Sequence, residues 1–163
     1  MRRCNGFSDD GVRLMTTGKL QYDMMSVLVL EDELHIRKII VRLLRQLGFS
    51  SIYEVSDGVD GMKELLRVRP SLILCDIHME PMGGLKFLQT LRSLKTHEVA
   101  NLPVVFLTAD AEVDTVLKAK ELRVDGYIAK PVRKAQLLAE IQRVAAAHGH
   151  KPIETRQSPR TGT

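Results

Sequence analysis

Short apolar runs alternate with amphipathic helical patterns along most of this chain. Ser26–Leu30 is a continuous apolar run, and from Leu34 apolar residues recur at helical spacing until Gly48, which is placed to end a helix. An apolar run without polar alternation is typical of a strand that is buried on both faces of a sheet. The first 48 residues therefore predict one buried strand followed by one amphipathic helix.

The same order of strand and helix recurs four more times. The predicted strands are Ile52–Val55, the apolar run that ends at Cys75, Pro103–Leu107 and Tyr127–Ala129, and the predicted helices are Val59–Val68, Leu85–Leu94, a weaker one through Val113–Leu122 and one through Leu137–Val144. Five such units imply parallel strands joined by right-handed crossovers, with helices on both faces. The expected fold is α/β, a doubly wound five-stranded parallel sheet with five helices in three layers.

The two ends of the chain lack this pattern. Residues 1–25 are polar, are broken by Asn5-Gly6 and Asp10-Gly11, and predict a flexible leader. Residues 149–163 contain Pro152 and Pro159 and predict a disordered tail. The predicted domain therefore spans residues 26–148, and the Met24-Met25 pair before it is a hypothetical alternative start of translation.

Composition and charge narrow the class of protein. The chain has 163 residues with 44% hydrophobic and 4% aromatic content, which suits one globular domain with an aliphatic core. Its net charge of +4 comes largely from the ends, so the basic balance is weak support for nucleic-acid binding. No helix-turn-helix or zinc-finger pattern adds to that support. We expect no nucleic-acid partner.

Localisation signals are also missing from the sequence. No apolar stretch approaches the length needed to cross a membrane, and Met1-Arg-Arg is not followed by the apolar core of a signal peptide. The two cysteines, Cys4 and Cys75, lie far apart, so a disulfide framework is not expected. These features predict a cytoplasmic protein that has no membrane partner.

The strongest candidate for chemistry is Asp76. It ends the third apolar run and is followed by a turn that contains Pro81 and the Gly83-Gly84 pair, so it lies at the exposed end of a strand. Ligands of open parallel sheets bind beyond the carboxyl ends of the strands. Taken alone, Asp76 is equally well explained as a cap for the helix that follows.

Polar residues follow the other strands too. They are Glu31 and Asp32 after the first strand, Asp76 after the third, Thr108 after the fourth and Lys130 after the fifth. Crowded carboxylates repel one another unless a cation is present, and hard divalent cations prefer oxygen ligands, so the group favours Mg²⁺. A lysine and a hydroxyl opposite the acids suit an anion beside the metal. The combination indicates a phosphoryl site.

These motifs resemble those of the receiver domain of two-component response regulators, and the resemblance covers about residues 26–147. The motifs that carry it are Val27-Leu-Val-Leu-Glu31-Asp32-Glu33, Leu72-Ile-Leu-Cys-Asp76-Ile-His-Met79 with Gly84-Leu85, Leu107-Thr108-Ala109, and Gly126-Tyr127-Ile-Ala-Lys130-Pro131. They occur in the family's order and at suitable spacing. The resemblance implies a flavodoxin-like fold and a stand-alone regulator of the chemotaxis type, not a conventional enzyme.

The resemblance assigns a role to each residue of the group. Asp76 would accept a phosphoryl group from a sensor histidine kinase or a histidine phosphotransfer protein. Glu31, Asp32, Asp76 and the backbone carbonyl of His78 would hold Mg²⁺, with Glu31 acting mainly through water. Lys130 would pair with Asp76 and then with a phosphoryl oxygen.

The same family pattern predicts a conformational switch. Thr108 and Tyr127 would form the switch pair, and the face of the fourth helix, fifth strand and fifth helix would bind a downstream protein. We also predict a cis peptide bond between Lys130 and Pro131, since a bond before proline lowers the cost of that isomer. The protein is expected to be a monomer or a phosphorylation-dependent dimer.

Two departures from the family pattern lie just after Asp76. Glu80 stands where the family commonly has proline, and Gly83 replaces a frequent acidic or amide residue. His78 and Asp110 lie two residues beyond Asp76 and Thr108, and we hypothesise that both influence the rate at which the phosphoryl group is hydrolysed.

Other interpretations stay open at this point. A hydrolase of the haloacid-dehalogenase kind also uses strand-end acids, Mg²⁺ and a lysine, but its nucleophile normally lies on the first strand with a second Asp two residues later. Here His78 occupies the position two residues after Asp76. A receiver that is part of a longer regulator, or a degenerate receiver that binds its partners constitutively, are further alternatives.

Overall fold

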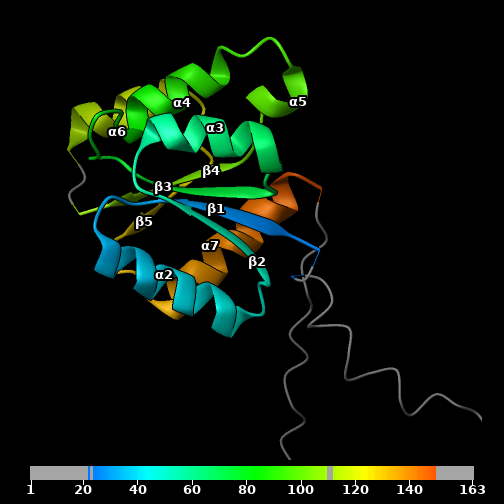
Figure 1. The fold of residues 1–163 in the computed structure, drawn as a ribbon. Helices are drawn as coiled ribbons and strands as arrows, with labels where there is room; N and C mark the ends of the chain where they lie inside the picture. Colours follow the sequence, from blue (N-terminus) through cyan, green and yellow to red (C-terminus); the bar gives the residue numbers. More distant parts are fainter. Residues whose placement is uncertain (1–21, 23, 110–111, 150–163) are drawn as a thin grey trace, which may run out of the picture.

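The computed structural model describes residue 22, residues 24–109 and residues 112–149. In this part of the chain a single parallel sheet has the strand order β2-β1-β3-β4-β5 (Figure 1). The strands are β1 (Ser26–Leu30), β2 (Ser51–Val55), β3 (Leu72–Asp76), β4 (Val104–Thr108) and β5 (Gly126–Ala129). The prediction of a five-stranded parallel sheet is confirmed.

Helices cover both faces of the sheet and make the fold three-layered (Figure 1). The described residues form α2 (Leu34–Leu47), α3 (Gly58–Val68), α4 (Gly84–Arg92), α5 (His97–Ala100), α6 (Val113–Glu121) and α7 (Lys134–Ala147). Five of them match the predicted helices. The sixth, α5, has four residues and lies in the polar connector before β4, where so short a helix leaves no periodic pattern in the sequence.

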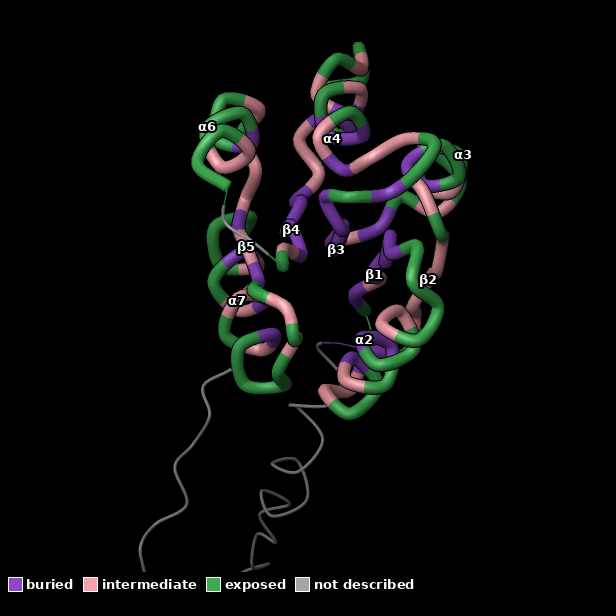
Figure 2. Tube along the Cα trace, turned by 90° about the vertical axis from the view of Figure 1, so that its left-hand side faces the viewer, coloured by how far each residue is buried: buried purple, intermediate pink, exposed green. Residues whose placement is uncertain are grey.

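Each face of the sheet has its own apolar core. One core lies beneath α2 and α7 and includes Val29, Leu44 and Ile141, while the other lies beneath α3, α4 and α6 and includes Leu28, Phe87 and Phe106. The strands β1, β3 and β4 are buried along their length, whereas the outer faces of the helices are exposed (Figure 2). This arrangement explains the unbroken apolar runs in the sequence.

The end of α2 and the beginning of α3 are each stabilised by a residue suited to that position. Gly48 ends α2 with φ of 102°, a left-handed conformation that glycine adopts without steric cost. The Asp57 carboxylate begins α3 by accepting hydrogen bonds from the backbone N–H groups of Val59 and Asp60, at 2.7 and 3.1 Å. The end of α2 at Gly48 agrees with the sequence-based expectation.

Arg92, at the end of α4, joins several segments on the side of the sheet opposite to the strands' carboxyl ends. Its buried guanidinium donates to the backbone carbonyls of Ala100, Leu102, Leu122 and Arg123 at 2.7–3.2 Å. It also forms an ion pair with the Asp125 carboxylate at 3.2 Å. Burial lowers the pKa of Arg92, against the opposing effect of Asp125. One side chain therefore connects α4, α5 and the segment that precedes β5.

The predicted leader and tail fall mostly outside the described residues. Tyr22 and Met25, at the end of the predicted leader, are buried against the core beneath α2 and α7. The ring of Tyr22 lies 4.6 Å from that of Phe49, between centroids. Within the described residues, no helix is long and apolar enough to span a membrane.

Candidate functional site

The carboxyl ends of β1, β3, β4 and β5 meet at one edge of the sheet. Leu30 pairs with Cys75 in the register of β1 and β3, and Thr108 pairs with Ala129 in the register of β4 and β5. Because the strands are parallel and in this register, the residues that follow them lie side by side. The structure therefore brings together the acids, the hydroxyl and the lysine that the sequence predicted to converge.

Glu31, Asp32 and Asp76 form an acidic cluster at this edge. Each offers one carboxylate oxygen, and these oxygens lie within 4.8 Å of one another. Glu31 is fully buried and Asp76 is 5% exposed, whereas Asp32 is open to solvent. Three oxygen donors of this kind, with one side open to water, fit a hard divalent cation.

Lys130 is the cation nearest to the two buried acids. Its Nζ lies 2.7 Å from Glu31 Oε2 and 3.3 Å from Asp76 Oδ1. Burial acts to lower the pKa of Lys130, but the hydrogen bond to Glu31 and the charge of Asp76 raise it above its ordinary value. The ammonium form is therefore retained, and it balances one of the buried negative charges.

Burial acts to lower the pKa of a lysine, but it raises the pKa of a carboxyl such as Glu31. The hydrogen bond to Lys130 acts against this rise in the pKa of Glu31. The neighbouring Cys75 is fully buried, and burial together with the charges of Asp76 and Glu31 raises the pKa of its thiol well above the ordinary value. The thiol is therefore protonated and inert at neutral pH.

The loop after Asp76 folds back closely on the end of β3. The Gly84 N–H donates to the Ile77 carbonyl at 2.8 Å, and the His78 N–H lies 3.4 Å from Asp76 Oδ1. The peptide bonds before Pro131 and before Pro81 are both cis. The prediction for the Lys130–Pro131 bond is thus confirmed, whereas the cis bond at Glu80–Pro81 was not predicted.

Gly84 allows the closest approach within this loop. A Cβ atom at this position would lie 2.4 Å from the Asp76 carbonyl oxygen and 3.0 Å from Ile77 Cα. We expect Gly84→Ala to lower the free energy of unfolding by about 1–3 kcal/mol, because the backbone must shift to relieve the overlap. Urea denaturation measures this loss. An unchanged free energy of unfolding in Gly84→Ala would contradict this explanation.

Tyr127 lies on β5 and contacts α6. Its hydroxyl donates to the Val116 carbonyl at 3.2 Å, and its ring centroid lies 6.3 Å from that of Phe106. Burial raises its pKa above the ordinary value. Thr108 ends β4, the strand between β3 and β5, so the predicted switch residues lie on adjacent strands. Asp110, the second residue predicted to affect hydrolysis, lies outside the described residues.

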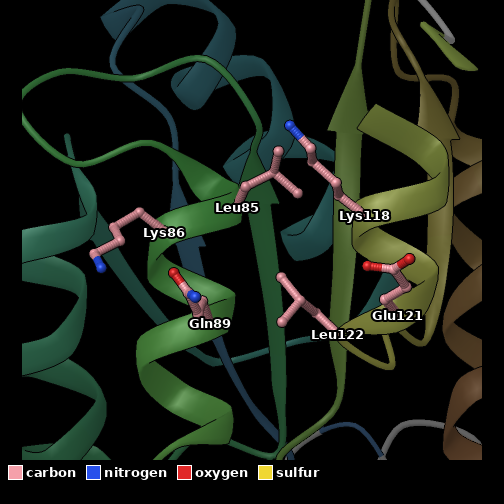
Figure 3. A pocket seen from close by; sticks show the side chains of 6 residues that line it. All are labelled: Leu85, Lys86, Gln89, Lys118, Glu121 and Leu122. Atoms are coloured by element: carbon pink, nitrogen blue, oxygen red, sulfur yellow. The ribbon is translucent and has the colours of Figure 1, made fainter. Parts of the chain in front are cut away.

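A hollow lies between α4 and α6 (Figure 3). It measures about 380 Å³ and is lined by Leu85, Lys86 and Gln89 from α4, by Lys118 and Glu121 from α6, and by Leu122, which directly follows α6. Its lining holds none of the acids, the hydroxyl or the lysine of the site at the sheet edge.

The fold and the site define a doubly wound α/β domain with an acidic cluster and a lysine at the carboxyl edge of its sheet. A family model described as the response regulator receiver domain matches residues 27–142. The chain belongs to this family, as the sequence motifs indicated.

Named relatives agree with this assignment. The chain is 31% identical over 120 residues to chemotaxis protein CheY-3 of Vibrio cholerae, covering 74% of this chain and 91% of the relative. It is also 31% identical over 120 residues to chemotaxis protein CheY of Pseudomonas aeruginosa, covering 74% and 95%.

Solved structures share the fold. Chemotaxis protein CheY4 of Vibrio cholerae has a TM-score of 0.68 at 25% identity, over 74% of this chain and 98% of that chain. A DNA-binding response regulator of the LuxR family from Staphylococcus aureus has a TM-score of 0.67 at 27% identity, over 74% and 98%. These similarities support a flavodoxin-like receiver fold.

Proposed function

We propose that the protein is a phosphoacceptor receiver that takes a phosphoryl group onto Asp76 and signals through a changed protein-binding surface. The observation that carries this proposal is the pairing of Asp76 with Lys130, inside an acidic cluster at the carboxyl edge of the sheet. Residues 26–148 form the receiver unit in this proposal, and its phosphodonor is a sensor histidine kinase or a histidine phosphotransfer protein.

The chemical step is a transfer between two nucleophiles. An Asp76 carboxylate oxygen attacks phosphorus, the P–N bond of the donor's phosphohistidine breaks, and the imidazole nitrogen leaves with the electron pair of that bond. Lys130, which is 3.3 Å from Asp76 Oδ1, provides a fixed positive charge beside the phosphoryl oxygens. The Thr108 hydroxyl, at the end of the adjacent strand, is a donor for another of these oxygens.

The metal that fits this cluster is Mg²⁺. Glu31, Asp32, Asp76 and the backbone carbonyl of His78 would hold it, with Glu31 acting mainly through water. When bound, the cation neutralises charge on the phosphoryl group during its transfer. The observed oxygen-rich donor set supports Mg²⁺ over Zn²⁺, which prefers nitrogen and sulfur ligands.

The proposed response involves α6, β5 and α7. The hydrogen bond from Tyr127 to Val116 connects β5 to α6, so movement of Tyr127 changes how α6 is held. Val113 and Leu117 of α6 are 71% and 53% exposed, which offers an apolar surface to a downstream protein. Phosphorylation would shift the population of two arrangements of this surface.

Incubation with acetyl phosphate and MgCl₂ tests the function directly. We expect stoichiometric addition of one phosphoryl group, detected by intact-protein mass spectrometry, and binding of beryllium fluoride to the same site. Slow modification at one residue supports a receiver, whereas rapid turnover of unrelated phosphate esters would support a hydrolase. No modification and no beryllium fluoride binding with Mg²⁺ present would contradict the proposal.

His78 provides a test of the signal lifetime. Its backbone N–H lies near Asp76 Oδ1, and its side chain is exposed at the mouth of the site, where it can affect the attacking water. We expect His78→Ala to change the first-order dephosphorylation rate by several fold, on the scale of a positioned group that contributes to proton transfer or water orientation. Loss of the phosphoryl mass shift with time, after acetyl phosphate is removed, measures this rate. An unchanged rate would remove His78 from this role.

A further inference from the structure

Arg37, on the first turns of α2, is bonded to the loop that carries two of the acids. Its guanidinium NH1 donates to the Glu31 backbone carbonyl at 2.5 Å. The side chain is only 14% exposed, although it belongs to a surface helix. A buried guanidinium on a backbone carbonyl fixes the orientation of that peptide group, since its planar donors have a rigid geometry.

Glu54 forms an ion pair with the same guanidinium, and among the described residues the Arg37 Nε–H has no hydrogen-bond partner. Arg37 Nε lies 3.4 Å from Glu54 Oε2, and Glu54 lies on β2, opposite Val29 of β1. The Glu31 N–H also donates to the carbonyl of Val55, the next residue on β2, at 3.1 Å. Both the N–H and the carbonyl of Glu31 are therefore fixed, directly or through Arg37, by β2.

The side chain of Glu31 is fixed as well. Glu31 Oε1 accepts the Glu33 N–H at 3.2 Å, and Oε2 contacts Lys130 Nζ at 2.7 Å. The peptide group whose carbonyl Arg37 bonds is the one that joins Glu31 to Asp32. A rotation of this group would move both carboxylates relative to Asp76, and the carboxylate oxygens of the three acids now lie within 4.8 Å of one another.

We propose that Arg37 is a positioning residue for the metal site, acting through the Glu31 carbonyl and anchored by Glu54. This inference rests on the proposed function, because it concerns the affinity of the same acidic cluster for Mg²⁺. Groups that orient metal ligands from outside the first coordination sphere commonly change metal affinity by about 10–100-fold when removed.

A simple charge effect predicts the opposite sign. Arg37 carries a positive charge close to a cation site, so removal of that charge alone would strengthen Mg²⁺ binding. Removal of a group that positions the metal ligands weakens Mg²⁺ binding. The direction of the change therefore separates the two explanations.

Lys38 is a matched control on the same helix. Its Nζ donates to both carboxylate oxygens of Glu54, at 2.9 and 3.1 Å, so Lys38 and Arg37 share this partner. Among the described residues, Lys38 has no hydrogen bond to the Glu31 carbonyl. Arg37→Met and Lys38→Met therefore remove the same charge from neighbouring positions. Only Arg37→Met removes the bond to the Glu31 carbonyl.

The experiment is an NMR titration of backbone amide shifts with MgCl₂ on the full chain, for wild type, R37M and K38M. We expect R37M to weaken Mg²⁺ binding by about tenfold, and K38M to change it by less than about twofold because its ion pair is exposed. R37K keeps the charge but lacks the rigid planar donors that fix the orientation of the Glu31 carbonyl, so we expect this variant also to bind Mg²⁺ more weakly than the wild type. It replaces R37M if that variant does not fold.

Two results distinguish failure of the inference from failure of the proposed function. Mg²⁺ affinity in R37M and R37K equal to or tighter than that of K38M would overturn the positioning role while the function stands. A wild-type protein that shows no Mg²⁺-dependent shifts near Asp76 would overturn the proposed function and this inference with it.

Discussion

Asp76→Asn is expected to abolish stoichiometric phosphoryl incorporation from acetyl phosphate. Asparagine has nearly the same shape as aspartate, so the fold is kept, but its amide is not the nucleophile that the proposed transfer requires. The position is 5% exposed and lies 3.3 Å from Lys130, so a neutral amide also weakens the charge pairing at the site. Intact-protein mass spectrometry after incubation measures the loss as the absence of the phosphoryl mass shift.

Asp60→Asn is the control for this variant. Asp60 is exposed on α3 and pairs with Lys63 at 2.9 Å, away from the acidic cluster. We expect Asp60→Asn to be modified like the wild type. Full modification of the Asp76→Asn variant would show that a different residue accepts the phosphoryl group, and would contradict the proposed site.

Lys130→Met is expected to reduce the free energy of unfolding by about 3 kcal/mol at neutral pH, the scale for breaking one side of a buried ion pair. The Lys130 side chain is 14% exposed, and its Nζ contacts Glu31 and Asp76. Methionine fills much of the same volume but leaves two buried acids without their cation. Urea denaturation measures this loss, and Lys63→Met, at an exposed ion pair, is the matched control with an expected change below about 1 kcal/mol.

The loss in Lys130→Met should depend on pH in a defined direction. Burial raises the pKa of Glu31, and Lys130 acts against this rise. A carboxyl with a higher pKa in the folded than in the unfolded protein binds its proton more tightly when folded, so protonation stabilises the fold. Without Lys130 the rise is larger, so the loss should be greatest at pH values between the raised pKa of Glu31 and the raised pKa of Lys130. The loss should diminish as the pH falls through the raised pKa of Glu31.

Added MgCl₂ should also restore part of this stability. A cation that binds the folded but not the unfolded chain stabilises the fold by mass action, and removal of the Lys130 ammonium leaves the acids free of a competing charge. We expect a larger gain from MgCl₂ in Lys130→Met than in the wild type. Stability that depends on neither pH nor MgCl₂ would contradict the view that Lys130 acts by charge compensation.

The sequence predicted the fold because this fold repeats one simple rule. The central strands β1, β3 and β4 are apolar on both faces and each helix is apolar on one, so periodicity identifies these elements. The parallel arrangement then places the residues after each strand at one edge of the sheet. The sequence therefore predicts that Glu31, Asp76 and Lys130 lie close together, as they do in the structure. The strand order was not predicted, because pairing between strands depends on contacts across the whole chain.

Other parts of the site could not be predicted from local patterns. The sequence pattern predicts that Arg37 is an ordinary polar residue on the exposed face of an amphipathic helix. Its ion pair with Glu54 is known only because the structure places β2 beside β1. Short-range signals contain no information on such partners, because residues 37 and 54 belong to different strand–helix units. The cis bond before Pro81 was also not predicted, because a proline alone does not determine which isomer the folded chain adopts.

The bonds of Arg92 give α5 a stability that it lacks on its own. A helix of four residues does not hold together in water, because forming its first turn costs more than its few hydrogen bonds return. The same guanidinium binds Ala100 at the end of α5 and Leu122 and Arg123 after α6. Opening of either segment exposes the buried charge of Arg92, so the two segments, more than twenty residues apart along the chain, form and open as a single cooperative unit.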